Sequence, residues 1–338
     1  MTTTSLAAST RAGAFLLAAA TLPLQLTAGP THAAEHDLKV VATIKPIHAL
    51  VAQIMDGVGT PTLLVQGAAS PHNYALKPSD ANALNKADIF FRVSENVEPF
   101  TRKIVTALPA SVRTVTLADA PGIEILDVRT GATFEEHGHT NHDHGHHRHD
   151  GHGHDHDDDH RHEANVRDGH VWLDPRNASK MVAEIARILS EASPADAEKF
   201  KANATRAEAA LVALEADLAN ELKPIENKPY VVFHDAYQYF ERRFGLSAVG
   251  SITVSPDAQP SAKRLTEIRK KLAALSASCV FSEPQFQPKL VTAVTEGTSA
   301  RSGTLDPEGA LVEPGPNAYV VLLKNLALSL KSCLAQGS

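Results

Sequence analysis

Hydrophobic residues along the chain fall into two patterns, short strand-like runs, some of them almost wholly apolar, and longer stretches with apolar residues at helical spacing. The short runs are typical of strands buried on both faces of a parallel sheet, and the longer stretches are typical of helices packed on it. In the first half, the predicted strands are residues 40–44, 62–65, 89–93 and 112–117. The predicted helices there include residues 47–55, after Pro46, and 79–87, after Pro78.

The second half repeats this plan. Its predicted strands are residues 230–233, 248–252, 280–283 and 303–305. Its predicted helices are residues 237–244, 261–275 and 288–296. Strands that alternate with helices predict parallel βαβ units, so we expect an α/β fold with two similar lobes, each a mostly parallel sheet flanked by helices.

A long helix is predicted between the two halves. Residues 196–222 are rich in Ala, Glu, Lys and Leu, contain no Gly or Pro, and follow Ser193-Pro194, a good helix start. At 1.5 Å per residue this helix would be roughly 40 Å long. Its apolar stripe consists of Ala204, Ala207, Leu211, Leu214 and Leu218. We expect it to pack on both lobes as a rigid backbone helix that permits only modest opening.

The amino-terminal segment has the pattern of a secretory signal peptide. Arg11 is its only charged residue, an apolar stretch covers residues 12–20, and Thr31-His32-Ala33 suits signal peptidase. A membrane anchor is the alternative, but it needs about 20 apolar residues, and Pro23, Gln25 and Gly29 interrupt this run. We therefore expect cleavage near Ala33, export to the periplasm and a mature protein without a membrane span.

Composition narrows the class of protein further. The formal net charge of −7 becomes one unit more negative when Arg11 is removed, which argues against a nucleic-acid partner. Roughly 300 mature residues favour more than one domain. The two cysteines, Cys279 and Cys333, are most simply a disulfide in an oxidising compartment, and two buried free thiols are the alternative.

Residues 135–163 contain 12 of the 18 histidines, interleaved with Asp and Gly. A stretch with almost no apolar side chains cannot offset the entropy of ordering, so a disordered insertion in the first lobe is expected. Such a density of imidazole indicates weak, exchangeable binding of several metal ions. A solvated spacer is the alternative. The histidines assigned to this auxiliary metal loop are His142, His144, His146, His147, His152, His154 and His156.

The remaining histidines of the mature chain suggest a single defined site. They are His36, His48, His72, His170 and His234. His72 comes just after the second predicted strand, His170 opens the run His-Val-Trp-Leu-Asp-Pro, and His234 ends the strand at residues 230–233. Strand ends form the mouth of an α/β sheet, so three imidazoles meeting there would suit tetrahedral zinc with one position left over. Asp306, at the end of the last predicted strand, is the candidate for that position, and water is the alternative. His48 lies inside the first predicted helix and is expected to pack in the core or to contact a metal ligand without binding the metal itself.

Four motifs in this order resemble the ZnuA family, the periplasmic zinc-binding proteins of ABC importers. They are Ser-Pro-His-Asn-Tyr-Ala-Leu-Lys-Pro-Ser-Asp from Ser70, His-Val-Trp-Leu-Asp-Pro from His170, Phe-His-Asp-Ala-Tyr from Phe233 and Gly-Thr-Leu-Asp-Pro from Gly303. The resemblance covers the chain from about Lys39 to Cys333. It implies two α/β lobes joined by a long helix, with zinc held in the interlobe cleft by residues that match His72, His170 and His234.

The resemblance also implies a Cys279–Cys333 disulfide and delivery of zinc, as transported ligand, to an inner-membrane permease. Some relatives have a glutamate just before the first ligand histidine, where this chain has Pro71. That leaves the fourth ligand open between Asp306 and water. Relatives that carry manganese or iron typically use Glu in place of the third histidine, whereas His234 favours zinc.

We therefore expect a monomeric zinc receptor that is not an enzyme. The alternatives are a zinc storage protein or metallochaperone that acts through the auxiliary metal loop, and a zinc hydrolase that uses the open position. No H-E-x-x-H, G-x-S-x-G or C-x-x-C motif supports an enzyme. The expected organisation is signal peptide 1–33, first lobe 34–192 with the insertion 135–163, linking helix 193–223 and second lobe 224–338.

Overall fold

The computed structural model describes residues 1–3, 5, 7–9, 37–129, 134, 167–253, 260–275, 277–286 and 289–335. The chain divides into two units, Met1–His36 and Asp37–Ser338, and both predicted lobes lie within the second unit. Most of the predicted signal peptide and the whole insertion 135–163, with its auxiliary metal histidines, lie outside the described residues.

The first lobe is built on a parallel sheet in the order β2-β1-β3-β4. Its strands are β1 (Val40–Ala42), β2 (Thr62–Leu63), β3 (Ile89–Arg92) and β4 (Arg113–Thr116). The connections contain α1 (Lys45–Ile54), the 3₁₀ turn η1 (Pro71–Asn73), α2 (Pro78–Asn85) and α3 (Thr101–Ala107). A further 3₁₀ turn, η2 (Leu117–Asp119), follows β4.

The second lobe repeats the arrangement, because its parallel sheet has the order β6-β5-β7-β8. Its strands are β5 (Pro229–Val232), β6 (Ser247–Ser251), β7 (Cys279–Ser282) and β8 (Arg301–Thr304). Its helices are α6 (Gln238–Phe244), α7 (Ala262–Ala274) and α8 (Lys289–Thr295). By position in the sheet, β1 corresponds to β5, β2 to β6, β3 to β7 and β4 to β8. The predicted α/β fold with two similar lobes is confirmed.

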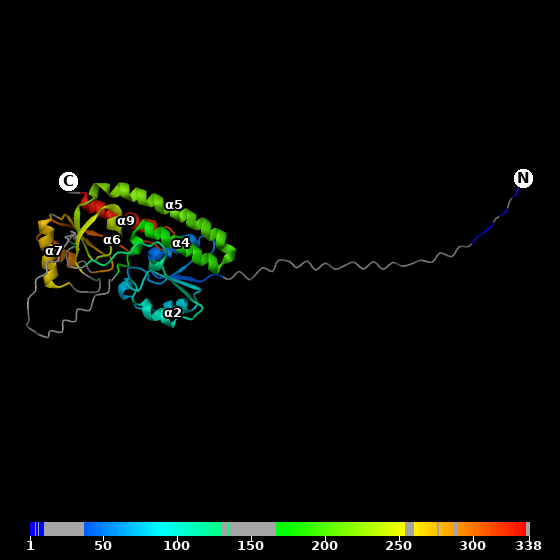
Figure 1. Ribbon diagram of the computed structural model, residues 1–338, viewed down its shortest axis with the longest axis horizontal. Coiled ribbons are helices and arrows are strands. Elements are labelled where there is room, and N and C mark those ends of the chain that lie inside the picture. The colour runs from blue at the N-terminus through cyan, green and yellow to red at the C-terminus, as the bar shows by residue number, and fades with distance from the viewer. Residues whose placement is uncertain are drawn as a thin grey trace, which may run out of the picture. The chain divides into compact units, whose positions relative to one another are not determined.

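Four further elements lie between the two sheets in the sequence or follow them. They are η3 (Val171–Leu173), α4 (Pro175–Ala192), α5 (Ala197–Leu222) and the carboxy-terminal helix α9 (Ala318–Leu334). The short turns η4 (Pro194–Asp196) and η5 (Lys223–Ile225) flank α5. Figure 1 shows α5 running beside α4 and α9, from the blue and cyan lobe to the yellow and orange lobe. The predicted linking helix is confirmed.

The predicted stripe on α5 is buried, with Ala204, Ala207, Leu211, Leu214 and Leu218 all at most 7% exposed. This face packs against α1 of the first lobe, α4 and α9. At 26 residues, α5 is long enough to reach both sheets. A single helix packed over its length on both lobes makes the connection between them rigid.

Each sheet is covered on both faces, and its central strands, such as β1 and β5, are accordingly apolar. Val40 and Ala42 of β1 belong to the largest core cluster, whereas Val41 between them faces a separate cluster with Leu84 and Phe90. The strand β5 alternates in the same way, with Val231 in an outer cluster beneath α7 and α8. The largest core cluster extends through both lobes, so the lobes share one hydrophobic interior.

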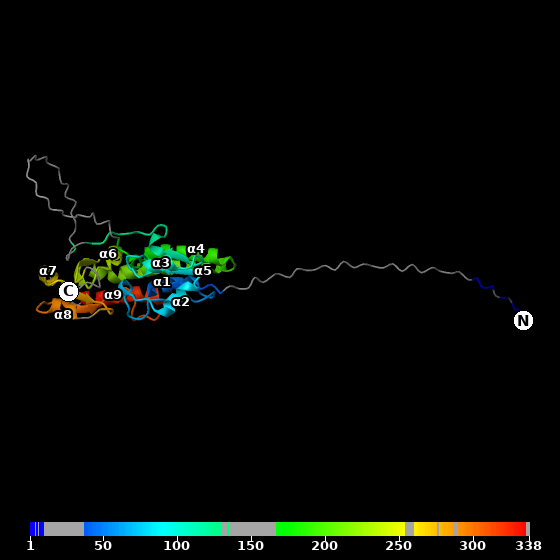
Figure 2. The same ribbon diagram turned by 90° about the horizontal axis from the view of Figure 1, so that it is seen from below.

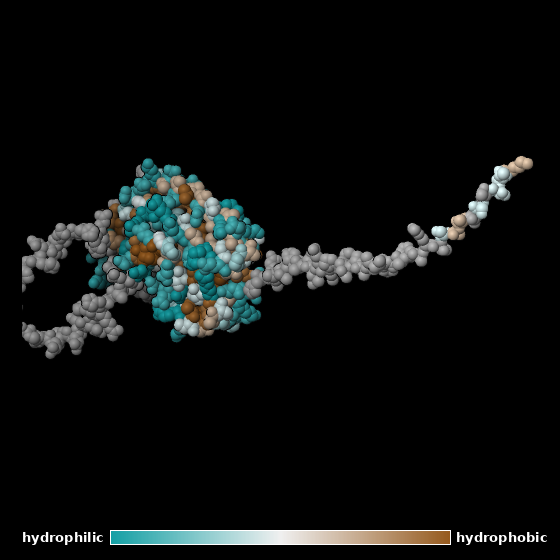
Figure 3. Space-filling view, turned by 45° about the vertical axis from the view of Figure 1, so that its right-hand side comes forward, coloured by the Kyte–Doolittle hydropathy of each residue, from teal (hydrophilic) through white to brown (hydrophobic). Residues whose placement is uncertain are grey.

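A disulfide joins Cys279 of β7 to Cys333 of α9, as predicted, with a Cα to Cα distance of 6.1 Å. It connects the second sheet to the helix that packs against α1 and α5. Among the described residues, no helix combines the length and apolar character needed to cross a bilayer. Figures 2 and 3 show the unit from other sides, and on the face in Figure 3 hydrophobic residues form small areas separated by hydrophilic ones.

Candidate metal centre

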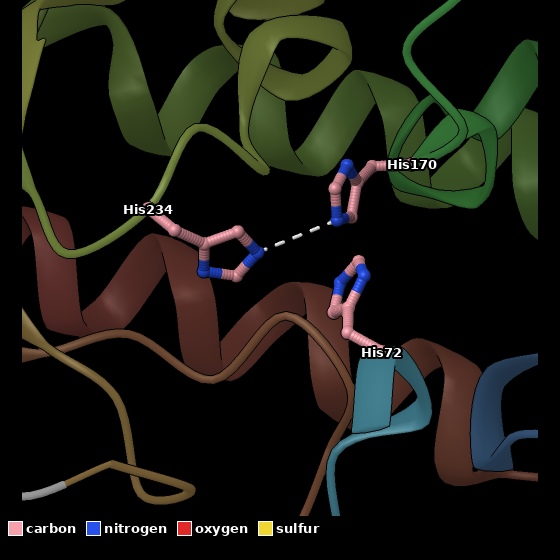
Figure 4. A group of neighbouring side chains, drawn as sticks. All are labelled: His72, His170 and His234. Carbon is pink, nitrogen blue, oxygen red and sulfur yellow. Dashed lines mark hydrogen bonds between the residues drawn. The ribbon is translucent and has the colours of Figure 1, made fainter. Parts of the chain in front are cut away.

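The structure brings His72, His170 and His234 together. Each offers one ring nitrogen, and these three atoms lie within 4.8 Å of one another. The ring centroids are separated by 5.4 Å (His72 to His170), 5.6 Å (His72 to His234) and 5.3 Å (His170 to His234). Figure 4 shows the three rings converging from three separate segments of the chain. Within the described part of the chain, this is the one group of three or more potential metal ligands found.

His234 follows β5 and comes from the second lobe. Its side chain is 3% exposed, and its Nδ1 lies 2.7 Å from Oε1 of Glu283, the residue directly after β7. Because β5 and β7 are neighbours in the sheet, their carboxyl ends place these two side chains together. Burial alone would lower the pKa of His234, but the charge and hydrogen bond of Glu283 outweigh it and raise that pKa.

His170 does not follow a strand of either sheet, contrary to the expectation that all three histidines sit at strand ends. It precedes η3, and its Nδ1 lies 2.7 Å from Oδ1 of Asp168. The backbone N–H of His170 also donates to Asp168 Oδ1. Gly169 makes this tight turn possible, because a Cβ there would lie 2.5 Å from Val97 Cγ2.

Asp168 is in turn held by hydrogen bonds to α6 and to the segment around Leu126. Its Oδ2 accepts from Gln238 of α6, and its carbonyl accepts from the Tyr239 hydroxyl. Its backbone N–H donates to the carbonyl of Leu126, next to an isolated antiparallel bridge between Asp127 and Arg167. The residue that orients His170 is therefore fixed against α6 and against the chain before the His-rich insertion.

His72 lies in η1 of the first lobe, after β2, and has a different environment. Ser70 caps this turn by accepting from the His72 backbone N–H. Nε2 of His72 is buried and has no hydrogen-bond partner among the described residues. Burial, together with the two neighbouring histidines, lowers the pKa of His72 to about 2. Its imidazole is therefore neutral, with a lone pair available to a metal ion, at any ordinary pH.

The spacing of the ring nitrogens suits zinc. Nε2 of His234 and Nε2 of His170 are 3.4 Å apart, the contact that is dashed in Figure 4. Two nitrogens that are each about 2.0–2.1 Å from one tetrahedral zinc ion would be separated by about 3.3 Å. Because the Nδ1 atom of each ring already faces a carboxylate, the Nε2 atoms are the ones directed toward a shared point.

Asp306 follows β8, as expected, but it is not part of the histidine group defined above. Its Oδ1 accepts from Gln285 Nε2 at 3.2 Å, and its Oδ2 accepts from the backbone N–H of Leu311 at 3.3 Å. The segment after Asp306 is tied to the first lobe, since Lys45 Nζ donates to the carbonyl of Gly309 at 2.6 Å. Asp306 therefore organises its own loop.

His48 lies within α1 and is buried, with Nε2 3.0 Å from the carbonyl of Pro61. It is outside the histidine group, as expected of a packing residue. Sequence reasoning missed Asp168 and Glu283 as partners of the histidines. A carboxylate two residues before a candidate ligand, as in Asp168-Gly169-His170, is a signal that could have found the first of them.

Comparison with known proteins agrees with this arrangement. Residues 40–333 match the family model ZnuA, described as "Zinc-uptake complex component A periplasmic". The chain is 49% identical to the high-affinity zinc uptake system protein ZnuA of Brucella suis over 306 residues, covering 88% of this chain and 92% of that protein. It is 39% identical to the Yersinia pestis protein of the same name over 296 residues, covering 87% and 91%.

Solved structures share the fold. One described as a crystal structure of ZnuA matches with a TM-score of 0.71 at 23% identity, covering 88% of this chain and 99% of that one. Another, described as a zinc-bound ZnuA deletion mutant lacking 138–173 of its own numbering, matches with a TM-score of 0.69 at 22% identity, covering 88% and 98%. With a family model matched over nearly the whole chain and curated relatives at up to 49% identity, the chain belongs to the ZnuA family of periplasmic zinc-uptake components.

Proposed function

We propose that this protein is a periplasmic high-affinity zinc receptor that binds one Zn²⁺ through His72, His170 and His234 and delivers it to an ABC-type importer. The observation that carries this proposal is the convergence of three ring nitrogens within 4.8 Å, two of them 3.4 Å apart. The names of the curated relatives, high-affinity zinc uptake system proteins, support zinc as the cargo. The receptor would act as a monomer and would not be an enzyme.

For the fourth ligand, the proposal favours solvent over Asp306. Both Asp306 oxygens already accept hydrogen bonds, one from Gln285 after β7 and one from the backbone N–H of Leu311, and using one as a ligand would break that contact. Three imidazoles and at most one oxygen ligand favour zinc over manganese, which prefers carboxylates. Copper(II) would bind such ligands at least as tightly, so discrimination against it depends on geometry and metal availability.

The proposed organisation includes segments beyond the described residues. Residues 1–33 would be a signal peptide removed on export, and the lobes 34–192 and 224–338 would be joined by the linking helix 193–223. Residues 135–163 would form an auxiliary collector that raises the local zinc concentration. A storage protein or metallochaperone that acts mainly through this collector is the second candidate, favoured by the histidine content of that segment.

A competitive zinc titration of the mature protein without residues 135–163 distinguishes these functions. The receptor predicts one tight site that survives the deletion. The His72→Ala, His170→Ala and His234→Ala variants should each weaken that site by more than the roughly 100-fold that loss of an outer hydrogen-bond partner can cause. Each should also lose most of the zinc-dependent rise in melting temperature.

Two results would contradict the proposal. A deletion protein that retains only weak binding would move the function to residues 135–163. A His234→Ala variant with an unchanged tight site would exclude His234 as a ligand. An Arg102→Ala variant is a control, because Arg102 is exposed on α3, pairs with Glu95 and is not part of the histidine group.

A further inference from the structure

Two of the three histidines have a buried carboxylate next to Nδ1, on the side of the ring away from the shared centre. Nδ1 of His170 is 2.7 Å from Asp168, with side chains 9% and 4% exposed. Nδ1 of His234 is 2.7 Å from Glu283, with side chains 3% and 1% exposed. In the described part of the chain no carboxylate pairs with His72 in this way, and its Nε2 has no hydrogen-bond partner there. The three candidate ligands are therefore not equivalent.

A carboxylate at this position determines which ring nitrogen can bind a metal. Neutral imidazole carries one N–H, which sits on either nitrogen, and the other nitrogen presents a lone pair. An ionised carboxylate only accepts hydrogen bonds, so it selects the form with the proton on Nδ1. The lone pair is then on Nε2, the nitrogen that both His170 and His234 direct at each other across 3.4 Å.

We propose that Asp168 and Glu283 are positioning residues of the metal site. Each fixes its histidine in the Nδ1–H form and aims Nε2 at the ion, while His72 completes the site without this support. The inference rests on the proposed function of the three histidines as zinc ligands. It goes further because it assigns a role to two residues that would not touch the metal.

The surroundings of the two carboxylates predict that Glu283 matters more. Asp168 also accepts from Gln238 and from the His170 backbone, so its charge is shared among several donors. Oε1 of Glu283 accepts from the side chain and the backbone N–H of His234, and Oε2 is buried without a hydrogen-bond partner among the described residues. Apart from its interaction with the buried Tyr237 side chain, the Glu283 carboxylate therefore acts mainly on His234.

The test compares the Asp168→Asn and Glu283→Gln variants with the parent protein by competitive zinc titration. Loss of such an outer partner typically weakens metal binding by about 10 to 100-fold, and we expect the larger loss for Glu283→Gln. Glu98→Gln is the matched control, since Glu98 is another buried glutamate and its side chain accepts hydrogen bonds from Thr43, Val93 and Ser94. That variant should bind zinc like the parent.

A second readout separates positioning from a merely structural role. Nitrogen-15 NMR of the metal-free protein reports which ring nitrogen of each histidine carries the proton. The parent should show the Nδ1–H form at His170 and His234. Glu283→Gln should introduce the Nε2–H form at His234 alone, because the new amide N–H can donate to Nδ1, and Asp168→Asn should do the same at His170 alone.

Parent-like zinc affinity in both variants, alongside loss of binding in His170→Ala and His234→Ala, would overturn this inference and leave the proposed function intact. Unchanged tautomers with weakened binding would also overturn it, because the carboxylates would then act on stability or folding. Absence of a tight site in the parent would instead remove the proposed function itself.

Discussion

The two lobes place a buried glutamate at corresponding points and use it differently. Glu98 follows β3 and hydrogen-bonds Thr43, which follows β1. Glu283 follows β7 and hydrogen-bonds His234, which follows β5. Since β3 and β1 occupy the same places in the first sheet as β7 and β5 in the second, the two pairs lie at topologically equivalent ends of the sheets, although Glu98 lies further past its strand than Glu283 does.

The difference lies in what donates to each carboxylate. Oε2 of Glu98 accepts from the backbone N–H groups of Val93 and Ser94 at 2.8 and 3.0 Å, and Oε1 accepts from the Thr43 hydroxyl. Its bonding capacity is largely used to fix the chain after β3. By contrast, no backbone N–H group among the described residues donates to Oε2 of Glu283. With the same topology, the glutamate of the first lobe holds the backbone after β3, whereas the glutamate of the second lobe contacts His234, a proposed metal ligand.

The largest expected effect is that Glu98 makes the free energy of unfolding depend on pH. Burial raises the pKa of Glu98 to about 7, although its hydrogen bonds oppose the rise. Between the unfolded pKa near 4.5 and about 7, the folded state keeps a proton that the unfolded state has lost. The free energy of unfolding should therefore decrease as the pH rises through this window, by up to about 3 kcal/mol.

Denaturant unfolding of the metal-free protein at several pH values measures this dependence. In the Glu98→Gln variant the decrease between about pH 5 and pH 7 should be smaller than in the parent, because an amide does not titrate. If both proteins showed the same pH profile, Glu98 would be ionised in the folded protein throughout this range. Its pKa would then not distinguish it from Glu283.

The next effect is on the stability of the metal-free protein when each carboxylate loses its side-chain partner. His234→Ala removes the imidazole that contacts the buried Glu283 carboxylate, and we expect the free energy of unfolding to fall by about 1–3 kcal/mol. Thr43→Val removes one donor from Glu98 but keeps both backbone N–H groups, so about 1 kcal/mol is expected. His72→Ala should cost less than His234→Ala, since Nε2 of His72 has no hydrogen bond to lose.

Urea titrations of the three variants without metal provide the comparison. Equal losses for His234→Ala and His72→Ala would mean that the Glu283 contact contributes nothing to the fold before zinc binds.

The smallest effect is expected at an exposed ion pair. Arg102 and Glu95 are 3.4 Å apart, with side chains 65% and 51% exposed. Arg102→Ala should change the free energy of unfolding by less than about 1 kcal/mol and leave zinc binding unaltered. A larger change would show that the stability of the segment after β3 depends on this ion pair as well as on the hydrogen bonds of Glu98.

Much of this fold follows from the sequence pattern, because central strands buried on both faces, such as β1 and β3, form recognisable apolar runs. The run at residues 40–44 contains β1, and the strand expected at 280–283 overlaps β7, which begins one residue earlier. The long helix α5 was recognisable from its length without Gly or Pro. By contrast, the amphipathic α4 and the strongly apolar α9 were not singled out, although both form part of the core.

The metal centre could be predicted only in part from the sequence. Each histidine stands in a distinctive local run, so the ligands could be named one by one. The pairing of His234 with Glu283 joins residues 49 positions apart and depends on β5 and β7 being neighbours in the sheet. Asp306 ends a strand as predicted, yet its carboxylate is held by Gln285 and Leu311, which no local pattern around Asp306 indicates.

The antiparallel bridge between Asp127 and Arg167 also has a consequence for how this family can be altered. It joins the chain segment before the insertion to the segment after it, directly before Asp168. The entropy lost on closing a loop grows only logarithmically with its length, by about 0.6 kcal/mol for each doubling. Natural variation or protein engineering can therefore lengthen, shorten or exchange the sequence between these segments, for example for a fluorescent reporter, at little thermodynamic expense to the histidine that follows.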